Sequence, residues 1–218
     1  MKSLTFLILA FSFLLIKNVA SQDTLILQPG PEGKDAIICD YYTTNIGDYP
    51  NLFAQTGFHE VPFITRSLFE FDLSSIVPGA EILEAKLSLY FANNPGNPHY
   101  QTNDNSAFLQ RVITTWEEYL VTWYNQPEIT TENQVLLPNS QYPDQDYTDI
   151  DIKSLIQDII NDPGNSFGLL FRLQYEEADR RMFFASSDHL NPILRPKLEI
   201  IYSDCPLPSV GFEFIVDH

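Results

Sequence analysis

Short runs of alternating or β-branched residues recur along the chain, and breaks rich in turn-forming residues separate them. The runs are TLILQ, DAIICD, NLFAQT, RSLFEFD, EAKLSLYF, AFLQRVI, DYTDIDI, SFGLLFRLQY, RMFFAS and KLEIIY. Breaks such as PGPEG, NNPGNP, PNSQYPDQD and NDPGN supply the glycine, proline, asparagine and aspartate that turns require. Strands at this spacing are typical of all-β proteins, so the sequence predicts an antiparallel, jelly-roll-like β-sandwich.

One segment has helical rather than strand periodicity. Its apolar residues are Ile152, Leu155, Ile156, Ile159 and Ile160. Asp151 stands where it can cap a helix, and the Pro163-Gly164 pair stands where it would end one. We therefore expect a single short α-helix near residues 152–161, with its apolar stripe packed over one end of the sandwich.

The N-terminus has the features of a secretory signal. Lys2 is followed by an apolar run from Leu4 to Ile16 and then by KNVASQ, which offers small residues for cleavage. The run is shorter than the roughly 20 apolar residues of a membrane span. The sequence predicts a signal peptide over residues 1–21, a mature chain starting near Gln22 without membrane insertion, and a secreted, extracellular or cell-surface location.

The mature chain reads as one domain over residues 22–203. After Tyr202 the composition of the sequence changes. It continues as SDCPLPSVGFEFIVDH, a proline-rich segment followed by one strand-like run. We interpret residues 204–218 as a linker and the start of a truncated second domain or a tail.

The charge balance narrows the class of partner. The chain has 12 basic and 29 acidic residues, and removing Lys2 and Lys17 with the signal leaves a net charge of −19. A surface this negative repels nucleic acid and anionic membranes, so neither is an expected partner.

The only two cysteines, Cys39 and Cys205, lie near the first strands and just after the last one. In an exported protein an even number of cysteines favours a disulfide. The alternative is that Cys39 is a small buried residue and that Cys205 belongs to the segment after the domain.

Four blocks in order resemble a DNRLRE domain, also called carbohydrate-binding module family 96 and related to archaeal disaggregatase repeats. They are RSLFEFDLSSIVPGAEILEAKLSLY, WEEYLVTWYNQP, TDIDIKSLIQDIINDPGNSFGLLF and FASSDHLNPILRPKLEIIY. The resemblance spans about Asp23 to Tyr202. It implies a β-sandwich of secreted or surface proteins that binds polysaccharide, is not an enzyme, and is joined to catalytic, adhesion or sorting domains. A structural or adhesive surface module without glycan binding is the alternative.

The two tryptophans lie seven positions apart, in TTWEEYLVTWYNQPEI. Trp116 follows a predicted strand and is expected to fill the core. Trp123 precedes the Asn125–Pro127 turn, at a strand end where sandwiches keep binding loops. We expect Trp123 to be partly exposed beside Tyr124, where either ring could stack on a sugar.

Three predicted strands, RSLFEF, KLSLYF and FGLLFRLQ, alternate polar and apolar residues. The alternation places Phe69 and Phe71 on one side of the first strand, and Phe167 and Leu169 on the hidden side of the third. If they share one sheet, their polar residues form a patch suited to sugar hydroxyls and carboxylates. The patch comprises Arg66, Glu70, Lys86, Tyr90, Arg172 and Gln174. The competing interpretation is an ordinary solvated sheet face with cross-strand ion pairs.

Signals for catalysis and metals are weak. HEVPF at His59 lacks the second histidine of a zinc-protease motif, and Asp149 and Asp151 are explained by capping as well as by a glycosidase pair. The acidic turns TNDN and PDQD offer oxygen ligands for a structural Ca²⁺, yet neither has the spacing of a calcium loop. No cofactor is assigned, and the metal question stays open.

Overall fold

The computed structural model describes residues 22–204 except residues 60, 94–95, 97 and 100–102. The predicted signal peptide lies outside this part of the chain, as does the C-terminal segment from residue 205 onward. Cys39 is buried, while Cys205 lies outside the described residues. The disulfide between them therefore stays a prediction.

Eleven strands and one α-helix form the described domain. The strands are β1 (Asp23–Leu27), β2 (Lys34–Cys39), β3 (Asn51–His59), β4 (Val61–Glu70), β5 (Glu81–Leu89), β6 (Ala107–Val112), β7 (Ile129–Leu137), β8 (Tyr147–Asp151), β9 (Leu169–Leu173), β10 (Arg180–Ala185) and β11 (Lys197–Ser203). The helix α1 covers Lys153–Asn161, and short 3-10 turns occur at Trp123–Asn125, Pro163–Asn165 and Pro192–Leu194.

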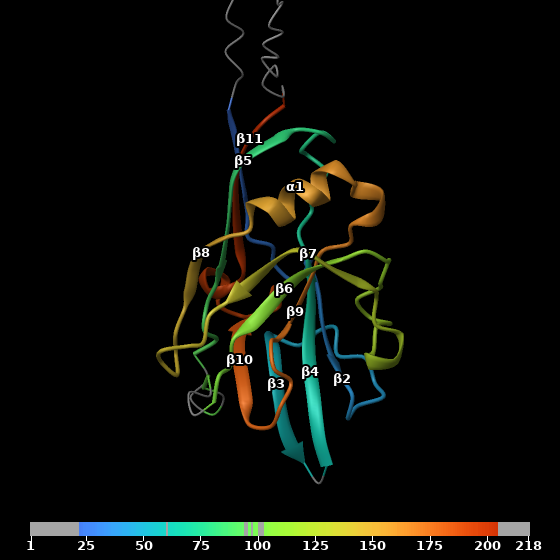
Figure 1. Cartoon of the computed structure of the whole chain (residues 1–218), viewed down its shortest axis with the longest axis vertical. Coiled ribbons are helices and arrows are strands. Elements are labelled where there is room, and N and C mark those ends of the chain that lie inside the picture. The colour runs from blue at the N-terminus through green and yellow to red at the C-terminus, as the bar shows by residue number, and fades with distance from the viewer. Residues whose placement is uncertain (1–21, 60, 94–95, 97, 100–102, 205–218) are drawn as a thin grey trace, which may run out of the picture.

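The strands form two antiparallel sheets that face each other (Figure 1). The smaller sheet has the order β1-β11-β5-β8. The larger sheet has the order β10-β3-β4-β9-β6-β7. Its remaining strand, β2, lies outside this order and pairs with β4. This arrangement confirms the predicted all-β sandwich with one short helix.

Alternating side chains of the two sheets fill the space between them. Phe69 and Phe171 of the larger sheet share one buried cluster with Leu87 and Ile200 of the smaller sheet. The helix α1 lies across one end of the sandwich (Figure 1) and buries the apolar stripe that the periodicity predicted, including Leu155. The Asp151 carboxylate accepts a hydrogen bond from the Lys153 amide at 3.0 Å, as expected of a residue at the helix start.

A second apolar cluster lies on the outer face of the larger sheet. Leu68 of β4 and Leu170 of β9 belong to this cluster, whereas their chain neighbours Phe69 and Phe171 belong to the inner one. Residues 113–128, between β6 and β7, cover these outward leucines with Trp116 and other apolar side chains. Both faces of the central strands are therefore buried.

Phe167 departs from the alternation that the sequence suggested. It was expected on the inner side with Leu169, but it packs partly buried against the outer cluster. Between the two lies Gly168, with a φ of +86°, and a Cβ at this position would lie 2.5 Å from the Phe69 carbonyl oxygen. The glycine allows the chain to change direction just before β9 and to approach β4 closely.

The two ends of the described chain run side by side. In the pairing of β1 with β11, Asp23 stands opposite Tyr202. Both ends therefore lie at the same end of the molecule, the end nearest α1, while the β3–β4 hairpin lies at the other (Figure 1).

The outer cluster depends on Trp116, and this generates a stability prediction. The ring is 5% exposed, its Nε1 donates to the Phe167 carbonyl oxygen at 2.8 Å, and Lys34 Nζ lies 4.3 Å from its centroid. We expect Trp116→Ala to lower the free energy of unfolding by roughly 3 to 5 kcal/mol, because it leaves a cavity and removes the cover of the outward leucines. Urea unfolding measures the change. Tyr124→Ala, at an exposed position of the same segment, is the control, and equal losses in the two variants would contradict the assignment.

Candidate functional site

The segment over residues 113–128 presents exposed apolar and aromatic side chains. Tyr119, Leu120 and Tyr124 are all exposed, and Tyr124 is 71% exposed. Trp123 is only partly buried and packs against the outer cluster. The buried Trp116 and partly exposed Trp123 agree with the sequence prediction.

Hydrogen bonds hold the turn that carries Tyr124. The side-chain oxygen of Asn125 accepts from the Thr122 amide at 2.6 Å and from the Thr122 hydroxyl at 2.8 Å. The Asn125 side-chain nitrogen donates to the Leu120 carbonyl at 3.1 Å. These hydrogen bonds hold the backbone of the turn that carries the exposed Tyr124 ring.

A second loop, around residues 45–47, supports the segment over residues 113–128. The Asn45 side-chain nitrogen donates to the carbonyl oxygens of Glu118 and Val121, each at 2.7 Å. Gly47 lies so close that an added Cβ would be 2.5 Å from the Glu118 carbonyl oxygen. The loop around residues 45–47 therefore fixes where the Tyr119–Tyr124 surface stands relative to the sheet.

Arg66 of β4 lies beneath the same segment. Its Nε and Nη2 donate to the two carboxylate oxygens of Glu176 at 2.7 and 2.8 Å, and its Nη1 donates to Gln126 Oε1 at 2.9 Å. Its guanidinium carbon is 4.6 Å from the centroid of the Trp123 ring. The contacts with Gln126 and Trp123 tie this segment to the sheet, and those with Glu176 tie the β9–β10 connection to it. Arg66 therefore acts first as an anchor of the surface beside Tyr124.

The expectation of one polar patch on a single sheet is wrong. β4 and β9, which carry Arg66, Glu70 and Arg172, are neighbours in the larger sheet, but β5 belongs to the smaller one. Lys86 of β5 and Tyr90, which follows it, are therefore separated from the other four residues of the proposed patch. The shared polar–apolar alternation could not reveal which sheet each strand joins.

Three residues of that patch, Lys86, Arg172 and Gln174, are engaged with protein groups. Lys86 pairs with Glu84 at 2.8 Å. Arg172 donates to Gln110 Oε1 at 2.9 Å and to the Leu173 carbonyl, and Gln174 accepts from the Ser106 hydroxyl at 2.8 Å. The Arg172–Gln110 contact joins β9 to β6, whereas the Lys86–Glu84 pair lies within β5. These contacts favour the interpretation of an ordinary sheet face whose polar groups already have protein partners.

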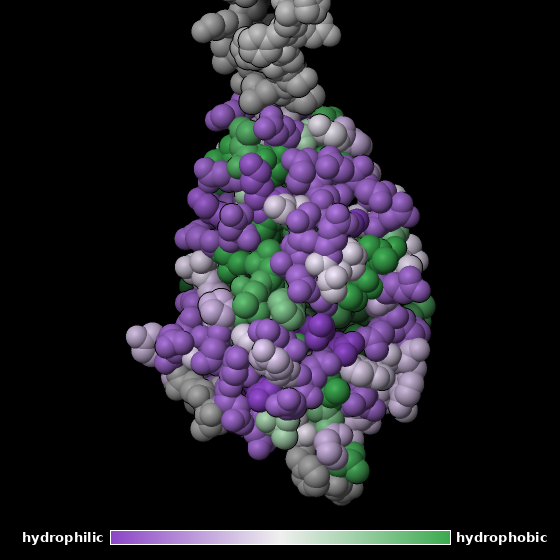
Figure 2. Space-filling model, viewed as in Figure 1, coloured by the Kyte–Doolittle hydropathy of each residue, from purple (hydrophilic) through white to green (hydrophobic). Residues whose placement is uncertain are grey.

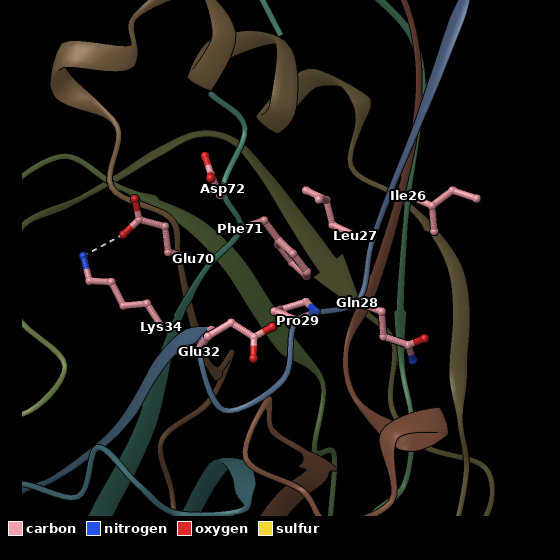
Figure 3. Close-up of a pocket in the computed structure, with 10 residues that line it drawn as sticks. Ile26, Leu27, Gln28, Pro29, Glu32, Lys34, Glu70, Phe71 and Asp72 are labelled. Atoms are coloured by element: carbon pink, nitrogen blue, oxygen red, sulfur yellow. Dashed lines mark hydrogen bonds and ion pairs between the residues drawn. The ribbon is translucent and has the colours of Figure 1, made fainter. Parts of the chain in front are cut away.

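Glu70 faces a different part of the surface, a cleft of about 570 Å³ between the two sheets. One wall is the end of β1 with the loop that follows, and the other is the start of β2 with the end of β4 (Figure 3). It is lined by Ile26, Leu27, Gln28, Pro29, Glu32, Gly33, Lys34, Glu70, Phe71 and Asp72. In the view of Figure 1, hydrophilic side chains cover most of the surface, and apolar side chains gather in patches between them (Figure 2).

The polar groups of the cleft are mostly acidic. Lys34 Nζ lies 2.7 Å from Glu70 Oε2, and both side chains are about one-third exposed or less. Phe71 lies between Leu27 and this ion pair (Figure 3). Sequence reasoning placed Phe71 on the same side of its strand as Phe69 and missed the cleft, since no local pattern shows that the PGPEG turn will stand beside the end of β4.

A group of carboxyls lies close to the base of the same region. Asp35 is 2% exposed, and its Oδ2 accepts the Ser187 amide at 2.8 Å. Burial raises the pKa of Asp35 to about 7, and the neighbouring Asp188 and Glu118 add to this effect. Burial also raises the pKa values of Glu118 and Asp188.

No part of the described chain places three or more histidine, cysteine or acidic side chains where they could jointly hold a metal ion. In each of the two acidic turns considered for calcium, one carboxylate accepts a hydrogen bond from a backbone amide. Asp104 accepts from the Ser106 amide, and Asp146 accepts from the Phe91 amide. A structural Ca²⁺ stays an untested prediction.

Fold and surface together define a two-sheet β-sandwich whose loops display aromatic rings beside acidic groups. Residues 31–202 match the family model described as carbohydrate-binding module family 96. The match covers most of the chain, and the chain therefore belongs to this family, as the four sequence blocks indicated. A search among curated proteins found no match. Of the helices in the described residues, none is long and apolar enough to cross a membrane.

The anchoring role of Arg66 predicts a loss of stability on truncation. We expect Arg66→Ala to lower the free energy of unfolding by about 2 kcal/mol, because it removes three charge-assisted hydrogen bonds and leaves the Glu176 carboxylate without its partner. Thermal or urea unfolding provides the measurement. Lys86→Ala, which breaks the exposed pair with Glu84, should leave the unfolding midpoint unchanged. An Arg66 variant as stable as this control would show that the loop is held by other contacts.

The buried carboxyl of Asp35 predicts a dependence of stability on pH. The folded protein keeps the Asp35 proton to a higher pH than the unfolded chain, because the folded pKa is raised to about 7. The stabilisation is therefore complete below about pH 4 and is lost as the pH rises through 7, by an amount on the order of 4 kcal/mol.

Unfolding free energies measured from pH 4 to pH 8 test this prediction. Asp35→Asn, which cannot ionise, should remove most of the decline over this range. Asp144→Asn, at an exposed aspartate, should keep the decline of the original protein. Parallel pH profiles for the original protein and Asp35→Asn would contradict the assignment.

Proposed function

We propose that the chain is a secreted, non-catalytic module that binds a polysaccharide through the surface formed by residues 113–128. The observation that carries this proposal is the exposed Tyr124 ring on a turn braced by Asn125 and Asn45, beside the partly exposed Trp123. Membership of a carbohydrate-binding family supports it.

The chemistry of such a surface suits sugars. The faces of a pyranose ring carry C–H groups that pack against an aromatic ring, and the ring edges carry hydroxyls that need polar partners. An ordered display of the aromatic ring reduces the entropy lost on binding. Tyr124 and Trp123 supply the rings, and the predicted contribution of Arg66 is to hold them in place.

Secretion is supported by the N-terminal signal pattern of residues 1–21. A non-catalytic role is supported by the use of the Asp151 carboxylate on the backbone at the start of α1, which accounts for one member of the only acidic pair considered for glycosidase chemistry. Appended catalytic, adhesion or sorting domains are the partners proposed for a module of this kind.

A structural or adhesive module is the second candidate, and one observation favours it. Leu190 and Ile193, in the connection between β10 and β11, are 93% and 70% exposed. Exposed large apolar side chains in one loop are a feature of protein-contact surfaces. Binding to a protein partner without binding to any glycan would support this candidate.

The proposal predicts that Tyr124→Ala weakens glycan binding about tenfold, equivalent to about 1.4 kcal/mol, with little change in stability. A glycan array run on the secreted chain identifies the ligand, and isothermal titration measures the affinities. Tyr142→Ala is a matched control, since Tyr142 is also an exposed tyrosine but lies in the connection between β7 and β8. Equal affinities for Tyr124→Ala and Tyr142→Ala would exclude the residue 113–128 surface as the binding site.

A further inference from the structure

We propose that the cleft between β1 and the end of β4 is a second sugar-binding surface, and that it selects uncharged polysaccharides over those with carboxylate or sulfate groups. The proposal rests on the carbohydrate-binding function and adds a ligand class to it. Three sets of observations carry it: the dimensions of the cleft, its mixture of apolar and acidic walls, and the engagement of the cations in the described chain.

The dimensions of the cleft suit an extended ligand. Its volume of about 570 Å³ is within the range of small-molecule sites. A second hollow of about 290 Å³ adjoins it and shares Glu70, Phe71 and Asp72 with it. This hollow continues toward Pro163, just beyond α1, so the two together form an elongated depression across the end of β4.

The walls offer both kinds of contact that a neutral sugar requires. Phe71, Leu27 and Pro29 supply apolar surface for the face of a sugar ring. Glu70, Asp72 and Gln28 supply oxygen acceptors that can receive hydrogen bonds from sugar hydroxyls. A carboxylate accepts strong hydrogen bonds from hydroxyl groups, whereas it repels a second carboxylate.

The acidic groups of the cleft are held in their charged form. Glu32 accepts the Gly30 amide at 2.8 Å, and this hydrogen bond lowers the pKa of Glu32. Asp72 accepts the Ser74 amide at 2.9 Å, and hydrogen bonds from Ser74 lower the pKa of Asp72. With Glu70, three carboxylates line the cleft, where Lys34 already pairs with Glu70 and the Arg195 guanidinium lies near Glu32.

The rest of the described surface offers few lysine or arginine side chains without a partner that could bind an acidic polysaccharide. Among the ten lysine and arginine residues that the structure describes, nine make side-chain hydrogen bonds or ion pairs with protein groups, and Lys153 on α1 is the exception. An acidic glycan would therefore have to displace existing partners. An uncharged sugar can bind without displacing these partners.

Part of the cleft wall lies outside the residues that match the family model. The family match begins at residue 31, whereas the wall made by residues 26–29 precedes it. This wall exists because β1 pairs with β11 and ends beside Phe71. The cleft is thus built partly by a segment outside the matched range.

Affinity electrophoresis and isothermal titration test the proposal on the secreted chain. The ligands are uncharged polysaccharides (β-glucan, xylan and mannan) and acidic ones (alginate, pectate and a sulfated galactan). We expect binding to at least one uncharged polymer and at least tenfold weaker binding to every acidic one. Binding to the uncharged polymer should not change with salt, because no charge contact is screened.

Two variants locate this binding in the cleft. Glu70→Gln and Asp72→Asn should each weaken binding to the uncharged polymer at least fivefold. Glu84→Gln is the matched control, because Glu84 also pairs with a lysine but does so on β5 of the smaller sheet, and it should bind like the original protein. Asp72 is exposed, so its variant is expected to fold even if the loss of the Lys34–Glu70 pair destabilises the other.

The outcomes separate this inference from the proposed function. Preference for an acidic polymer, or full affinity in both cleft variants while Tyr124→Ala loses binding, would overturn the role of the cleft and leave carbohydrate binding in place. Binding to none of the polymers or arrayed glycans would overturn the proposed function itself.

Discussion

Burial of Leu68 and Leu170 on the outer face of the larger sheet is the constraint on which the rest of the molecule depends. A sandwich buries the inner faces of its sheets, and apolar residues on an outer face must find another cover. Residues 113–128 supply it, with Trp116 as the largest cover. Because this segment cannot leave the sheet without exposing the leucines, it becomes a fixed part of the surface, and its outward side is free to carry Tyr124.

Two of the cations, Arg66 and Lys34, help to fix that cover. Arg66 is bound by Glu176 and Gln126, and Lys34 lies over the Trp116 ring while it pairs with Glu70. In a chain with far more acidic than basic residues, positive groups used in this way cannot also attract an acidic ligand. Stability and ligand selectivity are therefore linked through the same side chains.

The sequence predicted the features that depend on local periodicity. The two-sheet fold, the helix near residues 152–161 and the different burial of Trp116 and Trp123 follow from alternation, capping and turn residues, and the structure confirms them. β7 was missed, because its polar sequence ITTENQVLL contains Asn133 in a left-handed conformation and pairs with β6 through a register shift. Two further features, the sheet to which β5 belongs and the cleft beside Phe71, depend on contacts between residues that are distant in sequence.

One sequence signal did indicate that both faces of β4 and β9 are buried. It is the pair of adjacent apolar residues in each strand, Leu68-Phe69 and Leu170-Phe171.

The pairing of β1 with β11 bears on how such a module can be combined with others. A domain whose entry and exit points are adjacent can be placed within a surface loop of a larger protein without forcing the ends of that loop apart. Its β3–β4 hairpin end would then point away from the host. In such an arrangement the end of the domain opposite the chain ends stays uncovered by the host.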